Sequence, residues 1–414
     1  MAQFSLTEQT NLFKINYYKK SENMYNSENV LQGRIRKRYD FSGKERFVAT
    51  PMSFSGGVGS GTLPVANSGR YEGAHIYSKK VYATCEIERE AIKASIGNEG
   101  AFVRATQETV KKAVESYMRN ASRILFSDGS GLLGQGLGTA VIGGTGTVAT
   151  PWLVTVANFN QAYWEERDYV QLVTGITGAP GVGTVDTNLL EIVAVNPATK
   201  VISLVGTSAA LTALQGAPLP ATAGFAMQGS FYKDPMGLDG IVKASILGTG
   251  NLYDIPVQRR WSMTTSDALT AGITADLMNG VMLAIERKFG KSPKMIMTGY
   301  VQFQKMLALM EDQKVYNLPN RNIKGQMSFQ GVEFMSTRGP IGIFVDRFCP
   351  DDRVFFLNDD FIEVHHRPDF GWFDDDGTVF LRVANKDSYD ARYGGYYENY
   401  ITPTPHGVLY NLAL

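Results

Sequence analysis

Cysteine is scarce in this sequence. Cys85 and Cys349 are the only two among 414 residues. Two thiols are too few for a disulfide framework or a cysteine-rich metal site, and such scarcity suits a reducing compartment. We therefore expect packing and assembly to stabilise the protein.

Long apolar runs are also missing. No stretch approaches the roughly 18 uninterrupted apolar residues that a membrane-spanning helix needs. The first 20 residues contain no basic segment followed by an apolar run, which is the mark of a secretion signal. The sequence predicts a soluble protein that is made in the cytoplasm.

The sequence has no excess of charge of either sign. Forty basic residues balance 40 acidic ones, and the pI is near 6.9. A neutral chain has no overall field to attract a polyanion, so it is not a typical nucleic-acid binder. Charged residues make up 19 %, so much of the surface must be uncharged. A subunit that buries large areas against its neighbours has this composition.

Familiar enzyme motifs are absent. The sequence has no Gly-x-Ser-x-Gly, no His-Glu-x-x-His and no Walker loop. Residues 129–134 match G-x-G-x-x-G, but a dinucleotide site needs that turn between a strand and a following helix. Here the motif follows a predicted helix. We interpret it as a flexible loop and expect no cofactor.

One cluster of histidines and aspartates invites a metal-site interpretation. His365 and His366 precede the acidic run 374–376. Adjacent residues on a strand point to opposite faces, so both histidines cannot easily bind one ion, and Asp-Asp-Asp-Gly is typical of a hairpin turn. We expect a solvated turn and no metal.

The N-terminal quarter predicts an arm followed by a hairpin. Residues 1–40 show no sustained period and end in a basic cluster, which indicates an extended arm. Residues 41–90 contain two strand-like limbs around a glycine-rich tip, and alternation over 81–87 marks the returning limb. An isolated hairpin is only marginally stable in water. A neighbouring subunit would supply the surface that it needs.

The rest of the chain predicts a mixed α+β architecture. An apolar stripe indicates a long helix over 99–126, ended by the glycine-rich residues 127–147. Short strands over 149–229, with a turn at Asn196-Pro197, indicate a small β-barrel or sandwich. A helix over 274–290, a short strand, a second helix and mainly strands from 332 to 414 complete the chain.

This order of elements resembles the major capsid proteins of tailed bacteriophages with the Hong Kong 97 fold. Residues 275–312 are similar to that family's helix-strand-helix run, and residues 331–358 to its central axial sheet. Residues 149–238 look like the extra β-domain that some members carry. The resemblance divides the chain into an N-terminal arm (1–40), an extended loop (41–90), a spine helix with the first part of a peripheral domain (91–148), an inserted β-domain (149–229), a return to the peripheral domain (230–262) and an axial domain whose last strands return to the peripheral domain (263–414).

The resemblance implies a structural protein and no enzyme. It implies self-assembly into pentamers and hexamers of an icosahedral shell, located in the virion, that encloses double-stranded DNA by confinement. Many members begin with a long scaffolding segment, whereas about 40 residues precede the hairpin here. We therefore expect a separate scaffolding protein, together with a portal protein and a decoration protein on the β insertion.

Several residues are candidates for contacts between subunits. The arginine and lysine residues of the arm could contact packaged DNA or acidic groups of a neighbour, and we favour the neighbour because phosphate contact would be salt-labile. Four tyrosines near the C-terminus suit either ordinary packing or a seam between subunits. The basic candidates on the arm and loop are Arg34, Arg36, Lys37, Arg38, Arg46, Arg70, Lys79 and Lys80, and the tyrosines are Tyr393, Tyr396, Tyr397 and Tyr400.

The family's original member links its subunits covalently through lysine and asparagine side chains. Lys79 and Lys80 on the predicted hairpin and Asn399 near the C-terminus are the nearest equivalents here, but no surrounding motif indicates that chemistry.

Two other classes of protein stay open. An encapsulin-type compartment shares the fold and would hold enzymes instead of a genome. A carbohydrate-binding or hydrolytic β protein would explain the inserted strands, but it predicts a paired carboxylate site that the sequence does not place.

Overall fold

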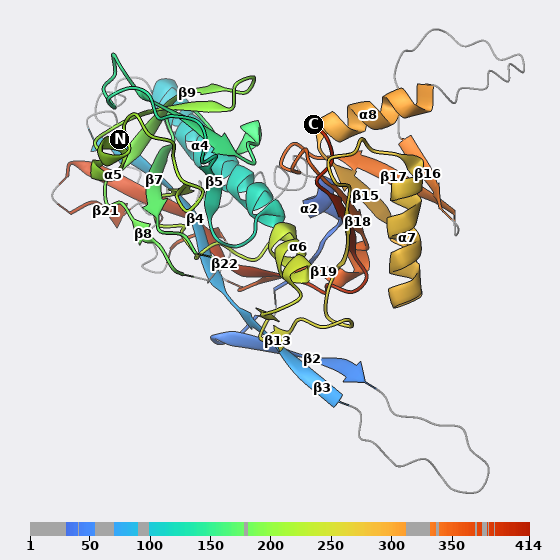
Figure 1. Ribbon diagram of the computed structural model, residues 1–414. Helices are drawn as coiled ribbons and strands as arrows, with labels where there is room; N and C mark the ends of the chain where they lie inside the picture. The colour runs from blue at the N-terminus through green and yellow to red at the C-terminus, as the bar shows by residue number, and fades with distance from the viewer. Residues whose placement is uncertain are drawn as a thin grey trace, which may run out of the picture.

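The computed structural model describes residues 30–39, 41–53, 70–89, 99–177, 181–311, 332–336, 339–368, 371–374, 379, 381–384 and 386–414. A β-barrel and a six-stranded sheet flanked by helices lie at opposite ends of the molecule, and a two-stranded hairpin projects from between them (Figure 1). The first 29 residues of the expected arm and the hairpin tip at 54–69 lie outside the described residues.

The hairpin consists of β2 (Glu45–Ser53) and β3 (Arg70–Tyr77), which pair antiparallel from Glu45 opposite Tyr77 to Ser53 opposite Arg70. We had expected the alternating segment at 81–87 to be the returning limb of the hairpin, and this prediction is wrong. That segment belongs to β4 (Lys79–Glu88), which pairs over ten residues with β22 (Ser388–Ile401). Its alternation arises because α4 covers one face of the strand.

The sheet that contains β4 and β22 is covered on one face by α4. This helix spans Glu99–Phe126, the range predicted from its apolar stripe. Tyr117 of α4 packs edge-on against Tyr393 of β22 with ring centroids 5.3 Å apart, and Met118 and Leu125 are buried in the same core. The remaining strands of the sheet are β1 (Arg36–Arg38), β19 (Ile362–His366), β20 (Gly371–Trp372) and β21 (Leu381–Arg382).

The barrel follows α4 directly. Its strands run in the order β11-β5-β6-β10-β9-β7-β8, and a further pairing of β11 with β7 closes the sheet around a core that includes Trp152 and Phe225. The sheet begins at Leu132, so the expected boundary at residue 149 falls inside it. The strands are β5 (Leu132–Gly136), β6 (Trp152–Ala157), β7 (Tyr169–Thr174), β8 (Thr184–Val185), β9 (Leu190–Asn196), β10 (Val201–Val205) and β11 (Gly224–Met227), with η2 (Gln161–Tyr163) and α5 (Ala209–Ala213) in the loops.

Helices α7 (Ala275–Phe289) and α8 (Tyr300–Glu311) flank the second six-stranded sheet. The Thr274 side chain caps α7, Gly290 ends it at φ 85°, and its apolar face packs on the sheet. The strand order is β14 (Thr264–Asp267), β23 (Gly407–Tyr410), β18 (Val354–Leu357), β15 (Met295–Thr298), β17 (Gly339–Val345) and β16 (Val332–Ser336).

Short elements complete the described chain: α2 (Val30–Arg34), α6 (Leu238–Leu247), β12 (Asn251–Leu252), β13 (Ile255–Pro256) and η3 (Asp359–Phe361). Within the described part of the chain, none of the helices has the length and apolar character needed to span a bilayer.

A buried polar cluster holds the segment 234–239, which we call the junction, where the chain leaves the barrel. Arg123 of α4 forms an ion pair with Asp234 at 2.8 Å, and both side chains are less than one-tenth exposed. Lys79 donates from Nζ to the Asp234 carbonyl oxygen at 2.5 Å. The Met236 amide donates to Glu398 of β22 at 2.5 Å. The junction thereby ties the barrel to α4, β4 and β22.

Close backbone packing also fixes the junction. A Cβ atom on Gly237 would lie 2.3 Å from the Ile124 carbonyl oxygen and 2.4 Å from that of Ser127, both at the end of α4. Only glycine fits at this contact. On the other side, Arg353 binds Asp239 and so connects the junction to the second sheet.

We expect Gly237→Ala to destabilise the protein by about 1–3 kcal/mol or more, because the new methyl group meets backbone that cannot move aside. Gly280→Ala is the matched control. Gly280 lies within α7 with nothing near its Cβ position, so alanine there should stabilise the protein by about 0.5–1 kcal/mol. Thermal or urea unfolding measures both. Equal stability of the Gly237→Ala variant and the wild type would contradict the close packing.

The stability contributed by Glu398 should depend on pH. Burial raises the pKa of this carboxyl to about 7, although Lys79 and the Met236 and Asn399 amides oppose the rise. The folded protein therefore keeps a proton that the unfolded chain has lost, and the associated stability is complete below the ordinary pKa of 4.5 and disappears as pH rises through about 7. Glu398→Gln cannot ionise, so its stability relative to wild type should rise by about 1–3 kcal/mol from pH 5 to 8.

Asp360→Asn provides the control for this measurement. The Lys294 ammonium lowers the pKa of the exposed Asp360 carboxyl, so this group stays ionised across the same pH range. Its substitution should change stability by an amount independent of pH between 5 and 8. A Glu398→Gln difference that stays flat over that range would contradict the assignment.

Candidate assembly surfaces

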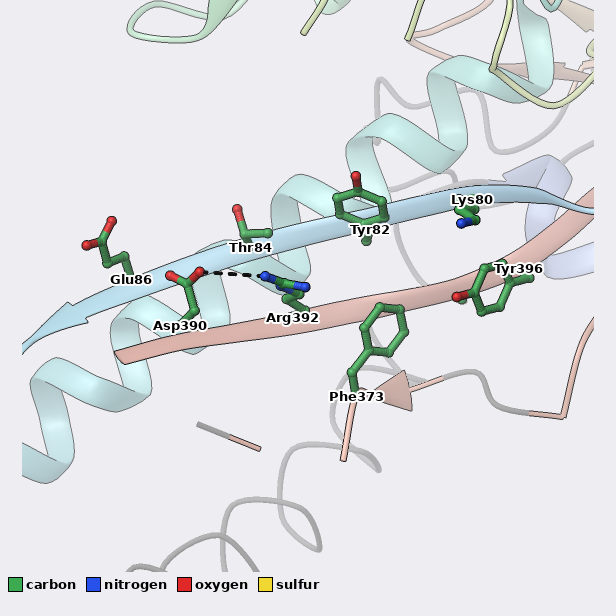
Figure 2. Close-up of a pocket in the computed structure, with 9 residues that line it drawn as sticks. Lys80, Tyr82, Thr84, Glu86, Phe373, Asp390, Arg392 and Tyr396 are labelled. Carbon is green, nitrogen blue, oxygen red and sulfur yellow. Dashed lines mark ion pairs between the residues drawn. The ribbon is translucent and has the colours of Figure 1, made fainter. Parts of the chain in front are cut away.

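A groove of about 530 Å³ lies on the face of β4 and β22 opposite α4 (Figure 2). Successive side chains of a strand point to opposite faces, so the even-numbered residues of β4 line the groove while the odd-numbered ones face the helix. The lining residues from the two strands are Lys80, Tyr82, Thr84 and Glu86 from β4 and Asp390, Arg392, Gly395 and Tyr396 from β22.

The groove combines aromatic rings with charges of both signs. Phe373 and Tyr396 lie nearly parallel with centroids 6.4 Å apart, and the Lys80 ammonium lies 5.8 Å from the Tyr396 ring centre. Tyr82 is 55 % exposed, and Arg392 lies 4.0 Å from Asp390. Aromatic and paired charged groups of this kind suit another protein surface better than a single ionic ligand.

The hairpin presents a second surface. Odd-numbered residues of β2 and β3 point outward, with Phe47 61 % and Tyr71 64 % exposed. The Phe47 ring lies over Gly73, where a Cβ atom would be only 1.8 Å from the ring, and it packs edge-on against His75. We call Phe47, Tyr71, His75 and Tyr77 the hairpin face.

The protein's own chain contacts the hairpin at its base. The His75 amide donates to the Tyr253 carbonyl oxygen at 3.0 Å, and the Tyr77 hydroxyl donates to Asp254 at 3.0 Å. Ala74 and Ile76 of β3 are buried there. The outward side chains nearer the tip remain available to another molecule.

The basic cluster of the arm binds acidic groups of its own chain. Arg36 lies 2.8 Å from Asp360, and Arg38 makes a two-pronged contact with Glu363 at 2.7 and 2.8 Å. Strand β1 runs parallel to β19, which brings these partners together. We had favoured acidic partners on a neighbouring subunit. The partners lie more than 320 residues away in the same chain, and the sequence alone gives no sign of that pairing.

The other two basic residues of the cluster also have contacts within the chain. The Arg34 guanidinium lies 4.0 Å from the centre of the Phe344 ring. Lys37 lies near His366, whose pKa is lowered to about 3, chiefly by burial and also by this lysine.

The candidates of the predicted hairpin have separate positions. Arg70 is 71 % exposed on β3 and pairs with Glu72 at 2.6 Å, and Arg46 is half-buried on β2. Lys79 and Lys80 belong to β4 and not to the hairpin, because that strand pairs with β22: Lys79 binds the junction and Lys80 lines the groove.

The structure does not support a lysine–asparagine link within this set. Asn399 is buried and donates from Nδ2 to the Met236 carbonyl oxygen at 3.0 Å. Both Asn399 and Lys79 are thus occupied at the junction.

Three of the four tyrosines lie in the core. Tyr393 packs against Tyr117, Tyr397 against His366, and Tyr400 against Tyr253, each with ring centroids 5.3 Å apart. This placement favours ordinary packing over a seam. Tyr396 alone of the four is partly exposed, in the groove.

The G-x-G-x-x-G motif follows α4 and runs into β5, so it connects a helix to a strand, the reverse of a dinucleotide site. Its glycines serve packing, because a Cβ atom on Gly131 would lie 2.2 Å from the Ser230 carbonyl oxygen. His365 and His366 are buried, and Asp375 and Asp376 lie outside the described residues. Among the described residues, no group of three or more histidine, cysteine, aspartate or glutamate side chains could hold a metal ion.

Sequence reasoning missed the groove. Its one local signal is the run of polar and aromatic residues at the even positions of β4, from Lys80 to Glu86. The other half comes from β22, about 300 residues later, and a single sequence does not reveal that pairing.

Comparison with known proteins places this geometry in context. Residues 219–371 match the family model described as SU10 major capsid protein. The fold is similar to the cyanophage A-1(L) capsid asymmetric unit with a TM-score of 0.54 at 10 % identity, over 94 % of this chain and 93 % of that one. No curated protein sequence matches the chain.

Weaker likenesses agree in kind but are too distant to carry an argument. The capsid of an empty GTA particle gives a TM-score of 0.43 at 8 % identity, over 93 % of this chain and 96 % of that one. The satellite phage P4 procapsid gives 0.40 at 8 % identity, over 98 % of both chains. The family match and the cyanophage-like fold together support a phage major capsid protein, which is a structural protein and not an enzyme.

Proposed function

We propose that the chain assembles into pentamers and hexamers of a closed icosahedral shell that encloses phage double-stranded DNA. The observation that carries this proposal is the projecting hairpin. An isolated two-stranded hairpin is only marginally stable in water, and this one exposes Phe47 at its base and Tyr71 beyond the base. Such a structure needs a surface on another molecule, and in a shell that molecule is a second copy of the chain.

The groove on β4 and β22 is the receiving surface in this proposal. Its rings, Tyr82 and Tyr396, suit the aromatic hairpin face. One copy would lay its hairpin across the groove of the next. Each contact can be weak, because many contacts made together give avidity.

The Hong Kong 97-like division of the chain belongs to the same proposal. The sheet of β4 and β22 with α4 corresponds to the peripheral domain and its spine helix, and the sheet flanked by α7 and α8 corresponds to the axial domain around the capsomer axis. The barrel is the outward insertion that receives a decoration protein. In the proposed shell, the N-terminal segment over residues 1–40 ties subunits together.

The partners follow from the shell. A separate scaffolding protein guides assembly in the host cytoplasm, and a portal protein occupies one vertex. Because the chain is neutral overall, DNA is held by confinement and not by sequence-specific contacts.

Tyr71→Ser in the hairpin face should lower the yield of shells at least tenfold, because it removes an exposed ring that the neighbour would bury. The subunit's own melting temperature should stay within about 2 °C of wild type, since surface changes cost little. Leu247→Ser, which alters a similarly exposed apolar residue at the end of α6, is the control and should assemble normally.

Electron microscopy and sizing chromatography of the protein, alone and with its scaffolding partner, measure the yield. Normal shells from Tyr71→Ser would remove the hairpin from the assembly mechanism. A wild-type protein that stays monomeric under both conditions would contradict the shell proposal itself.

A further inference from the structure

The barrel is almost free of charge. Of the 104 residues from 129 to 232, seven are charged, whereas 19 % of the whole chain is charged. Those seven are Glu165, Glu166, Arg167, Asp168, Asp186, Glu191 and Lys200. A domain whose only role was to stay soluble would carry a charged surface, so this depletion needs a reason.

Several of these charges have partners within the chain. Glu165 and Asp168 both bind Arg119 of α4. Asp186 accepts a hydrogen bond from the Ser208 hydroxyl at 2.6 Å. Two further charges border the outward side of β9 and β10: Glu191 is paired with Val205 at one end, and Lys200 directly precedes β10 at the other.

The outward side of β6, β10 and β9 is uncharged over two successive rows. Leu153, Ser203 and Ala194 lie side by side across the three strands, and Thr155, Val201 and Asn196 form the next row. We call these six residues, together with Val193 at the β9 bulge and Val141 on the adjoining loop, the neutral face.

Apolar side chains stand out from the neutral face. Leu153 is 45 % exposed, Val193 43 % and Val141 59 %. The isolated bridge of Gly143 with Leu153 brings the loop that carries Val141 beside β6. Strand β9 lies at the outer margin of the molecule, away from the hairpin and from the second sheet (Figure 1).

We propose that the neutral face binds the same face of a second copy, so that barrels of adjacent subunits join in the shell. This inference rests on the shell proposed above. An interface core is marked by depletion of charge, and the two rows contain no ionised group, because Glu191 and Lys200 lie beyond their ends. A charge-free face also meets its own copy without like-charge repulsion, which is the requirement of a self-complementary contact.

A second copy fits better than an accessory protein. The neutral face offers a partner no charge with which to set register or to select it, whereas a shell already holds copies near one another. At the resulting high effective concentration, a weak apolar contact is sufficient.

The first test introduces like charges. Leu153→Asp combined with Val193→Asp places four carboxylates at each contact, and we expect shells to need at least a tenfold higher protein concentration. Val182→Asp, at a similarly exposed valine beside β8 on another side of the barrel, is the matched control and should assemble like wild type. Melting of the unassembled subunits should be unchanged, because all three positions are exposed.

The second test identifies the occupant. A Leu153→Lys, Val193→Lys variant should fail in the same way, and an equal mixture of the aspartate and lysine variants should recover most of the wild-type yield, since opposite charges then meet. Recovery would support contact between copies.

Normal assembly of the aspartate variant would overturn the inference and leave the shell proposal intact. Failure of the mixture to recover would overturn contact between copies in favour of another partner. A wild-type protein that forms no shells would overturn the shell proposal and this inference together.

Discussion

The ion pair between Arg123 and Asp234 is buried at the point where the barrel, α4 and the sheet of β4 and β22 meet. Burying two charges costs several kcal/mol per ion unless their partners are well placed, and removal of one partner from such a pair typically costs about 3–5 kcal/mol. Two further contacts hold the backbone that carries Asp234: Lys79 donates to the Asp234 carbonyl oxygen, and Glu398 accepts from the next amide of the junction. The positions of the three bodies relative to one another therefore depend on this cluster.

A rigid junction lets the rest of the molecule carry surfaces that its own chain leaves uncovered. The hairpin is anchored only at its base, and the groove lies on the side of β4 and β22 that α4 does not cover. In a monomeric protein, exposed rings such as Phe47, Tyr71 and Tyr82 would favour aggregation. In the shell that we propose, these rings would form the contacts between copies, and the junction would set the angle between the hairpin and the groove.

Local signals in the sequence predicted the elements that depend on local chemistry. The apolar stripe located α4, Thr274 and Gly290 bounded α7, and Asn196 turns β9 into β10 by accepting a hydrogen bond from the Ala198 amide at 3.1 Å. The errors concern pairings between distant segments. A strand's alternation shows that one face is covered but not by what, so β4 was assigned to the hairpin. The acidic partners of the arginines in the arm could not be predicted for the same reason.

The distribution of charge explains why whole-chain composition was only a partial guide. A net charge of zero would also result if charged residues were spread evenly along the chain. Instead, buried and paired charges lie at the junction and around the arm. The 104 residues of the barrel contain only seven charged residues. Charged groups give register and partner choice, whereas neutral faces give contact without selectivity. A shell needs both kinds, because interfaces that fix the geometry must discriminate. Contacts that only strengthen the association of copies already in position do not need to select a partner.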